Sequence, residues 1–179
     1  MIIGLTGYAQ SGKDTVASLL VEHYGYERVA FADKIRSFLY EMNPLVACSP
    51  SGYLQDLVNL VGWDKAKQEP QVRRLLQHTG VGARKVFGEQ FWVHEAMKSM
   101  LDTPDTELKY VITDVRFTNE ADMIRANRGK IWRVVRPGVG PVNNHISESE
   151  LDSIKFDRLI TNDSGFEDLM IEVHSAYDV

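Results

Sequence analysis

The sequence predicts an α/β protein with a central parallel sheet of about five strands and helices on both faces of that sheet. Short apolar runs alternate along the chain with longer segments whose apolar residues recur at helical spacing. Such alternation is typical of a parallel sheet in three α/β/α layers. The chain has 179 residues, of which 44% are hydrophobic, which suits one domain with a sizeable core. We therefore expect residues 1–179 to form a single domain.

The N-terminal part of the chain predicts two strand–helix pairs. The apolar run Ile2–Thr6 is the first strand, and the apolar spacing that follows predicts a helix over Gly12–Tyr24. A second strand is expected over Glu27–Phe31. The apolar residues of Asp33–Met42 again recur at helical spacing, and Asp33, as the first residue of this helix, could accept hydrogen bonds as its N-cap.

The middle of the chain predicts short helices separated by loops. Pro, Ser and Gly predict a loop over Asn43–Gly52, while the spacing of apolar residues predicts helices over Leu54–Val61, Val72–His78 and Gln90–Leu101. Because glycine lowers helix propensity, three glycines are expected to break the path between the last two helices: Gly80, Gly82 and Gly88.

The C-terminal part returns to strands and helices in alternation. Gly129 follows an expected helix and Pro137 follows an expected strand, as is typical of such ends. The expected elements are, in order, a strand over Lys109–Thr113, a helix over Asn119–Asn127, a strand over Ile131–Val135, a loop over Pro137–Ser149, a short strand at Leu159–Ile160 and a helix over Phe166–Tyr177. Ligands of parallel sheets collect at the carboxyl ends of the strands, so polar residues after each strand are candidate site residues.

The most specific motif is the segment GYAQSGKDT at residues 7–15, between the first strand and the first helix. Its glycines let successive backbone N–H groups turn toward one anion, and the helix N-terminus adds a positive dipole end. This layout is typical of a phosphate-binding P-loop, in which the lysine reaches the β- and γ-phosphates. The alternative is a turn that carries these residues by chance. The donor-binding residues expected here are Gly7, Gln10, Ser11, Gly12, Lys13, Asp14 and Thr15.

A magnesium site is expected beside this loop. Asp14 stands where Ser or Thr usually follows the lysine, and its carboxylate could hold Mg²⁺ directly or through water. Alternatively, Asp14 stabilises the helix dipole and the Thr15 hydroxyl takes the metal. Asp114 ends an apolar strand and could hold Mg²⁺ or its water, with Arg116 offsetting the charge of the phosphates. The alternative for Asp114 is an N-cap of the next helix, with Arg116 on the surface.

Basic residues away from the loop suit a second phosphorylated ligand. Asp33 and Arg36 could orient the attacking oxygen and hold the phosphate of an acceptor, or they could form a solvated helix start. Arg74 and Gln77 lie three residues apart and share a helix face. The Arg74 guanidinium could bind the phosphate of a mononucleotide, and the Gln77 amide could form hydrogen bonds with the edge of its base. Arg84 could add a further phosphate contact or lie in solvent.

Three further features follow from position in the chain. Trp92 could stack on a base, although an aromatic pair in a helix more often belongs to the core. Residues 137–150, after Arg136, could form a lid that excludes water during phosphoryl transfer, with Arg136 near the phosphates. Asn162 follows the last strand and lies either in a helix-capping turn or against the adenine of a nucleotide.

The composition limits the kinds of molecule that the protein is expected to bind. A net charge of −5 and a pI of about 5.5 argue against a broad nucleic-acid-binding surface. Cys48 is the only cysteine, which excludes an intrachain disulfide and a cysteine metal cluster and fits a reducing cytoplasm. No apolar stretch reaches the length that spans a bilayer, and no signal peptide is recognised. The sequence leaves open whether the chain forms a homodimer.

Together these residues resemble the bacteriophage deoxynucleoside monophosphate kinases, a family within the P-loop nucleoside monophosphate kinase fold. The resemblance covers nearly the whole chain and rests on SGKDT at 11–15, RRLLQ at 73–77 with Gly80, FWV at 91–93, DVR at 114–116 with Glu120, VVRPG at 134–138, HISE at 145–148 and ITND at 160–163. It implies the reaction ATP + dNMP → ADP + dNDP with Mg²⁺, in the host cytoplasm for a phage-encoded enzyme. It also implies that Asp14 is a family feature and that Arg74, Gln77 and Trp92 bind the acceptor, in a helical region of residues 34–105.

Two other functions stay open at this point. A dephospho-coenzyme A kinase-like protein shares the fold and would phosphorylate a ribose hydroxyl. A nucleotide-binding switch would bind ATP or GTP without a small acceptor. The guanine-reading pattern Asn-Lys-x-Asp is absent from the sequence, and the Arg, Gln and Trp residues away from the loop favour an enzyme.

Overall fold

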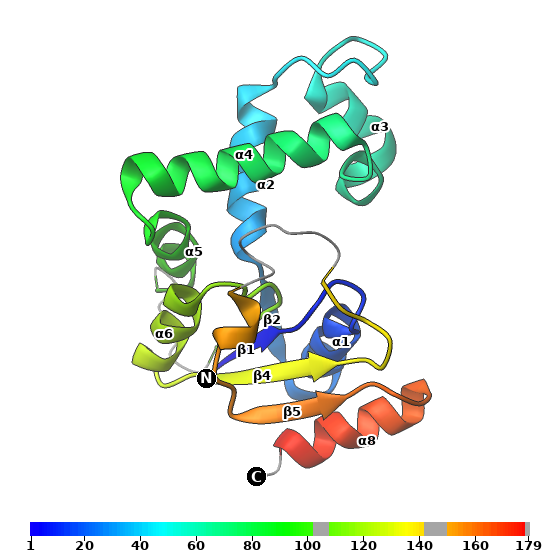
Figure 1. Ribbon diagram of the computed structural model, residues 1–179, viewed down its shortest axis with the longest axis vertical. Coiled ribbons are helices and arrows are strands. Elements are labelled where there is room, and N and C mark those ends of the chain that lie inside the picture. Colours follow the sequence, from blue (N-terminus) through cyan, green and yellow to red (C-terminus); the bar gives the residue numbers. More distant parts are fainter. Residues whose placement is uncertain (102–107, 142–149, 178–179) are drawn as a thin grey trace. The chain divides into compact units, whose positions relative to one another are not determined.

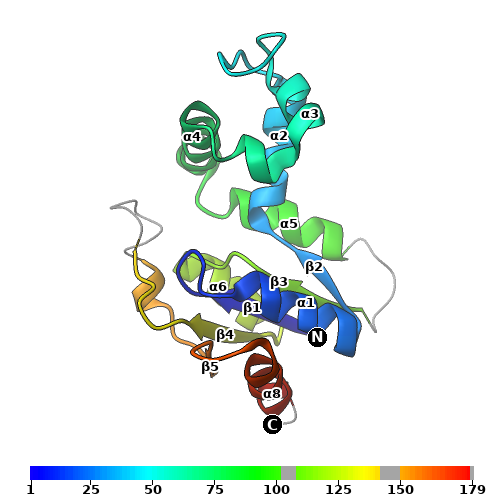
Figure 2. The ribbon, with the colours of Figure 1, turned by 90° about the vertical axis from the view of Figure 1, so that its right-hand side faces the viewer.

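The computed structural model describes residues 1–101, 108–141 and 150–177, and the chain divides into two compact units (Figure 1). Unit 1 comprises Met1–Ala30 and Met97–Val179 and holds the β-sheet, whereas unit 2 comprises Phe31–Ala96 and is helical. Figure 2 shows that β2 (Tyr26–Val29) leads almost directly into α2 (Phe31–Met42), the first helix of unit 2. The chain returns to unit 1 within α5 (Phe91–Leu101).

Unit 1 is built on a five-stranded parallel sheet with the strand order β2-β3-β1-β4-β5 (Figure 2). The central strand β1 (Ile2–Thr6) is buried along its whole length, as expected of a parallel strand that is covered on both faces. Its neighbours arise from the apolar runs further along the chain: β3 (Lys109–Ile112), β4 (Lys130–Val135) and β5 (Arg158–Thr161). The predicted parallel sheet is therefore confirmed.

Helices cover both faces of this sheet. Ile3 and Leu5 of β1 belong to an apolar core that also includes buried residues of α1 (Lys13–Tyr24) and α8 (Phe166–Tyr177). Side chains alternate along a strand, so Gly4 faces the opposite side, where a β-carbon would lie 2.6 Å from Cδ1 of Ile124 in α6. The three-layer α/β/α fold is thus confirmed. The remaining described elements of unit 1 are α6 (Thr118–Ala126) and a 3₁₀ turn, η1 (Leu151–Ser153), which was not predicted.

Unit 2 is a small helical assembly. Its helix α2 packs against α3 (Leu54–Ala66) and α4 (Pro70–Phe87). The buried residues between them include Leu39 of α2, Leu54 of α3 and Val72 of α4, which form one apolar cluster. The predicted helical region of residues 34–105 overlaps most of this unit. Its predicted role and the division of the chain into domains stay predictions.

The beginning of α2 differs from the prediction. Phe31 is the first residue of α2 and is buried, rather than the last residue of the preceding strand. Strand propensity of Phe favoured the strand, but burial of this side chain is satisfied equally by a helix. As a consequence, Asp33 lies inside the first turn and the prediction that it is the N-cap was wrong.

The path of α4 also differs from the prediction. The helix continues through Gly80 and Gly82 and ends only before Gly88. A glycine inside a helix costs about 1 kcal/mol, which tertiary packing can offset. At Gly80 a β-carbon would lie 3.2 Å from Cδ1 of Ile35 in α2, so this glycine permits a close approach of the two helices.

Candidate active site

The P-loop is held against the sheet by two glycines. Gly7 has a φ of 142°, and a β-carbon there would lie 2.2 Å from the carbonyl oxygen of Val134 in β4. Gly12 has a φ of 104°, and a β-carbon there would lie 2.3 Å from the side-chain nitrogen of Asn162. Only glycine combines these φ values with such close neighbours. The loop therefore runs along the carboxyl ends of β4 and β5, where parallel sheets bind ligands.

Inside the loop the chain makes a tight turn. Gln10 has a left-handed φ of 66°, and the N–H of Ser11 donates to the carbonyl of Tyr8 at 3.2 Å. Non-glycine residues in this conformation are uncommon and cluster at ligand-binding sites. Ser11 is 1% exposed, and its Oγ has no hydrogen-bond partner among the residues that the structure describes. A buried hydroxyl without a partner fits a ligand oxygen at this position.

Lys13 begins α1 and crosses the loop. Its Nζ donates to the carbonyl oxygens of Gly7 at 2.7 Å and Tyr8 at 2.6 Å. The ammonium group thus lies beside the backbone that would surround a phosphate. The following residues occupy the first turn of the helix, where Asp14 is exposed and Thr15 is half-buried. Both side chains are placed where an anion and its metal ion meet a helix N-terminus.

The end of β3 lies beside β1, the strand that leads into the P-loop. The N–H of Val115 donates to the carbonyl of Leu5 at 3.1 Å, which ties the segment after β3 to β1. Asp114 in this segment is half-buried and Arg116 is exposed. Because α6 begins at Thr118 with Phe117 as its N-cap residue, the alternative that Asp114 caps this helix is wrong.

Glu120 is a buried acid that the sequence reasoning did not select as a site residue. Its carboxylate accepts hydrogen bonds from the N–H groups of Arg116 at 2.7 Å and Phe117 at 3.0 Å. An acidic residue at the third position of a helix commonly reaches back to the N-cap backbone, which is the signal that could have found it. Glu120 thereby fixes the backbone that carries Arg116.

Asn162 contacts the P-loop rather than lying apart from it. Its side-chain nitrogen donates to the carbonyl of Ser11 at 3.0 Å, and its backbone N–H donates to the carbonyl of Val135 at 2.8 Å. The predicted contact with adenine stays a prediction. Arg136, which follows β4, is exposed. Most of the predicted lid at residues 137–150 lies outside the described residues, since these end at 141 and resume at 150.

The residues of this site suit a magnesium nucleotide. Mg²⁺ usually binds one or two protein carboxylates and completes its shell with water and substrate phosphates. Within 1–101, 108–141 and 150–177, no three His, Cys, Asp or Glu side chains gather into a metal site. A binding mode that needs only Asp14, Thr15 and Asp114, together with phosphate oxygens and water, fits the donor set that is present.

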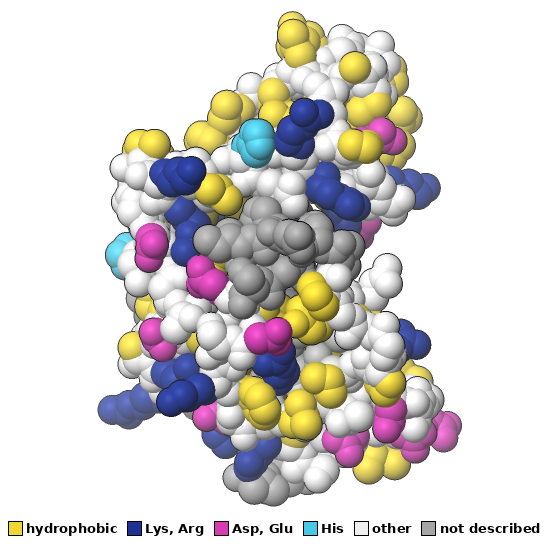
Figure 3. Space-filling view, viewed as in Figure 1, with side chains coloured by type: hydrophobic (Ala, Val, Ile, Leu, Met, Phe, Trp, Pro, Cys, Tyr) yellow, Lys and Arg dark blue, Asp and Glu magenta, His cyan; other side chains and the backbone are white. Residues whose placement is uncertain are grey.

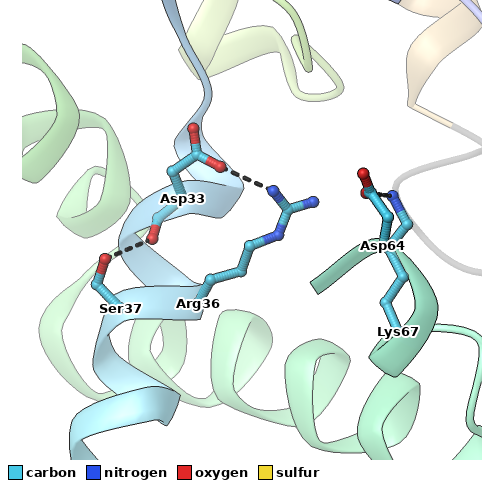
Figure 4. Close-up of polar contacts among 5 residues, drawn as sticks. All are labelled: Asp33, Arg36, Ser37, Asp64 and Lys67. Atoms are coloured by element: carbon cyan, nitrogen blue, oxygen red, sulfur yellow. Dashed lines mark hydrogen bonds and ion pairs between the residues drawn. The ribbon is translucent and has the colours of Figure 1, made fainter. Parts of the chain in front are cut away.

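In unit 2 the predicted acceptor residues lie on α2, α4 and α5. Figure 4 shows the pair on α2, in which Arg36 donates to the Asp33 carboxylate at 2.9 Å. The Ser37 hydroxyl donates to the Asp33 carbonyl at 3.0 Å. Asp33 therefore orients a guanidinium that is itself partly exposed.

A surface pocket of about 350 Å³ on α4 contains one predicted acceptor residue. It is lined by Gln71, Arg74, Leu75 and His78. Figure 3 shows basic side chains, with Lys and Arg drawn in one colour, on the part of the surface over α4. His78 was not predicted as a site residue, although its spacing of four residues from Arg74 places both side chains on one helix face. Gln77 and Arg84 are half-buried on the same helix.

Trp92 is part of an aromatic group within unit 2. Its side chain is 6% exposed, and its Nε1–H donates to the carbonyl of Gly80 at 2.9 Å. It meets Phe38 and Phe91 edge-on. The structure thus gives Trp92 a packing role, and its predicted stacking on a base stays a prediction. No helix in the described part of the chain has the length and apolar character to cross a membrane.

Fold and loop together define a P-loop kinase-like α/β/α protein. Among solved structures, the chain is similar to shikimate kinase from Aquifex aeolicus vf5, with a TM-score of 0.51, 14% identity and coverage of 99% of this chain and 96% of that one. It is also similar to dephospho-CoA kinase from Campylobacter jejuni, with a TM-score of 0.52, 13% identity and coverage of 99% and 95%. At these identities the likeness shows the fold alone.

The sequence comparisons narrow this class to one family. A family model described as deoxynucleotide monophosphate kinase matches residues 60–173. The chain is 29% identical to a putative deoxynucleotide monophosphate kinase of Acanthamoeba polyphaga mimivirus, over 99% of this chain and 96% of that protein. It is 31% identical to the deoxynucleotide monophosphate kinase of Escherichia phage RB69, over 57% of this chain and 43% of that protein. The chain belongs to the deoxynucleotide monophosphate kinase family, and it is a phosphotransferase.

Proposed function

We propose that the chain transfers the γ-phosphoryl group of ATP to deoxynucleoside monophosphates, in the reaction ATP + dNMP → ADP + dNDP. The observation that carries this proposal is the P-loop, in which Ser11 Oγ is buried without a described partner and Lys13 Nζ lies against the loop backbone. Family membership supports a dNMP as the acceptor. The phage and mimivirus relatives support action in the cytoplasm of an infected host.

Unit 1 would bind the donor. The backbone N–H groups of residues 7–13 and the N-terminus of α1 would hold the phosphates of ATP, while Lys13 would neutralise charge on the transferred group. Asp14, Thr15 and Asp114 would hold Mg²⁺, which would supply positive charge that reduces the repulsion among the phosphates. Arg116 and Arg136 are exposed after β3 and β4, the two strands that flank β1, and would stabilise negative charge during transfer.

Unit 2 would bind the acceptor. Arg36, Arg74 and Arg84 would hold the acceptor phosphate, since a guanidinium matches phosphate oxygens. Gln77 would donate to and accept from a base edge, and Trp92 would stack on the base. These roles rest on the family resemblance and on the position of all five residues in one unit.

Asp33 would act on the acceptor through Arg36. The attacking group of a dNMP is a phosphate oxygen, and the second pKa of a phosphate monoester is about 6, so it is already ionised at neutral pH. Such a nucleophile needs no general base. Asp33 would instead orient the Arg36 guanidinium, a role that the 2.9 Å contact between the two side chains supports.

A coupled assay of ADP release tests the proposal with dAMP, dGMP, dCMP, dTMP, the ribonucleotides and dephospho-coenzyme A as acceptors. Lys13→Met should lower kcat by about 10²- to 10³-fold, the range for removal of one transition-state donor. Lys155→Met, which removes an exposed ammonium from unit 1, is the matched control and should leave kcat unchanged. Arg74→Ala should raise the KM for the dNMP and leave the KM for ATP unchanged.

Three outcomes would contradict the proposal. Normal kcat in a folded Lys13→Met variant would remove the P-loop lysine from the reaction. An unchanged dNMP KM in Arg74→Ala would place the acceptor elsewhere. Phosphorylation of dephospho-coenzyme A but of no mononucleotide would favour the alternative ribose-hydroxyl kinase.

A further inference from the structure

A short polar network connects the P-loop to the segment that precedes β5. The Tyr8 hydroxyl donates to one carboxylate oxygen of Asp152 in η1 at 2.7 Å. The other oxygen of Asp152 accepts a hydrogen bond and ion pair from Arg133 in β4. Both oxygens of this carboxylate are therefore engaged, and the arrangement joins three separate parts of unit 1.

The far end of this network is firmly anchored. Arg133 belongs to β4, where it pairs in register with Thr6 of β1, immediately before the P-loop. Its guanidinium also lies 5.9 Å from the ring centre of Phe156. On either side of Asp152, the side chains of Leu151 and Ile154 are each 2% exposed. The carboxylate thus has a fixed support, although its own side chain is 61% exposed.

The near end of the network is the residue whose backbone holds the P-loop lysine. The Tyr8 carbonyl accepts a hydrogen bond from Lys13 Nζ at 2.6 Å, and also one from the Ser11 N–H. A displacement of the Tyr8 backbone would move this carbonyl away from the ammonium. The Tyr8 side chain, whose hydroxyl is held by Asp152, restrains such a displacement. The hydrogen bond from Tyr8, followed by that from Arg133, keeps the pKa of Asp152 below its usual value, so the carboxylate is ionised at neutral pH.

We propose that Tyr8 and Asp152 are positioning residues that fix Lys13 for the donor phosphates. They act through the Tyr8 carbonyl and touch neither substrate. The proposal rests on the proposed function, because it assumes that Lys13 binds the phosphates of ATP. It assigns a role to a tyrosine inside the loop and to an acid outside it that no phosphate-binding pattern requires.

The experiment measures binding of ATP to four variants by calorimetry. Tyr8→Phe removes only the hydroxyl, and Asp152→Asn removes only the charge. Each should weaken ATP binding about three- to tenfold, a range set by the loss of one charge-assisted hydrogen bond at a partly exposed site. Tyr53→Phe and Asp122→Asn remove an exposed hydroxyl and an exposed carboxylate elsewhere, and they should bind ATP as the wild type does.

A double-mutant cycle separates positioning from general structural support. In a Lys13→Met background, Tyr8→Phe should cause no further loss of ATP affinity, because its effect passes through the missing ammonium. Additive losses, or unchanged affinity in both single variants, would overturn the positioning role. If the wild type fails to bind ATP, or if Lys13→Met binds it normally, the proposed function fails instead.

Discussion

Replacement of Gly7 by alanine tests whether the loop is built on the close approach seen in the structure. A β-carbon at Gly7 would lie 2.2 Å from the Val134 carbonyl oxygen, whereas the shortest normal distance between a carbon and an oxygen atom that are not bonded is about 3.3 Å. The obstacle is backbone of β4, which cannot rotate away as a side chain does. An alanine held at a φ of 142° adds about 1–3 kcal/mol of backbone strain. Displacement of β4 by the new methyl group costs a further ~1–3 kcal/mol.

We therefore expect Gly7→Ala to lower the free energy of unfolding by about 2–6 kcal/mol. For a chain of this size the melting temperature would fall by about 2–4 °C for each of these kilocalories. Gly82→Ala is the matched control, because among the described residues nothing beyond the local backbone of α4 lies within 4 Å of a β-carbon at this position. It should gain about 1 kcal/mol from helix propensity. Equal melting temperatures for Gly7→Ala and the wild type, with normal ATP binding, would refute this reasoning.

Two further predictions concern Glu120 and Tyr26. Glu120→Ala leaves the N–H groups of Arg116 and Phe117 without their carboxylate and should cost about 1–2 kcal/mol in a urea titration, while Glu172→Ala, on the exposed part of α8, should cost nothing measurable. Burial, with the neighbouring Tyr177, raises the pKa of Tyr26, so the folded state retains a proton that the unfolded chain loses above about pH 10. Stability should therefore decline as the pH rises above 10, and Tyr26→Phe should flatten this decline in melting curves; parallel declines would contradict the assignment.

The donor half of the site was predictable from the sequence because its chemistry is local. Residues 7–13 follow each other directly, and the strand before them and the helix after them are both determined by short-range apolar patterns. Asn162 shows the limit of that reasoning. Its position after a strand was a sound signal, but its contact with the Ser11 carbonyl depends on β5 lying next to β4.

The contacts that the sequence could not predict are those that depend on packing. Tyr8 and Asp152 are 144 residues apart, and no periodic pattern relates them. The close approach of Ile35 to Gly80, where α4 continues through the glycine, likewise has no signal in the local sequence. Both contacts join residues that are distant in the sequence, and at Gly80 the helix also continues against the low helix propensity of glycine.

Trp92 illustrates why a sequence pattern alone cannot separate a packing role from a binding role. Its indole N–H donates to the carbonyl of Gly80, a residue that the sequence suggested would interrupt the helix. That carbonyl has two lone pairs, so it can accept this bond and still serve the helix. The glycine admits Ile35, and the tryptophan secures the same turn from α5. Trp92 therefore connects α5 to α4, the helix that carries Arg74. A change in the KM for the acceptor after replacement of Trp92 must first be corrected for the loss of this contact between the two helices.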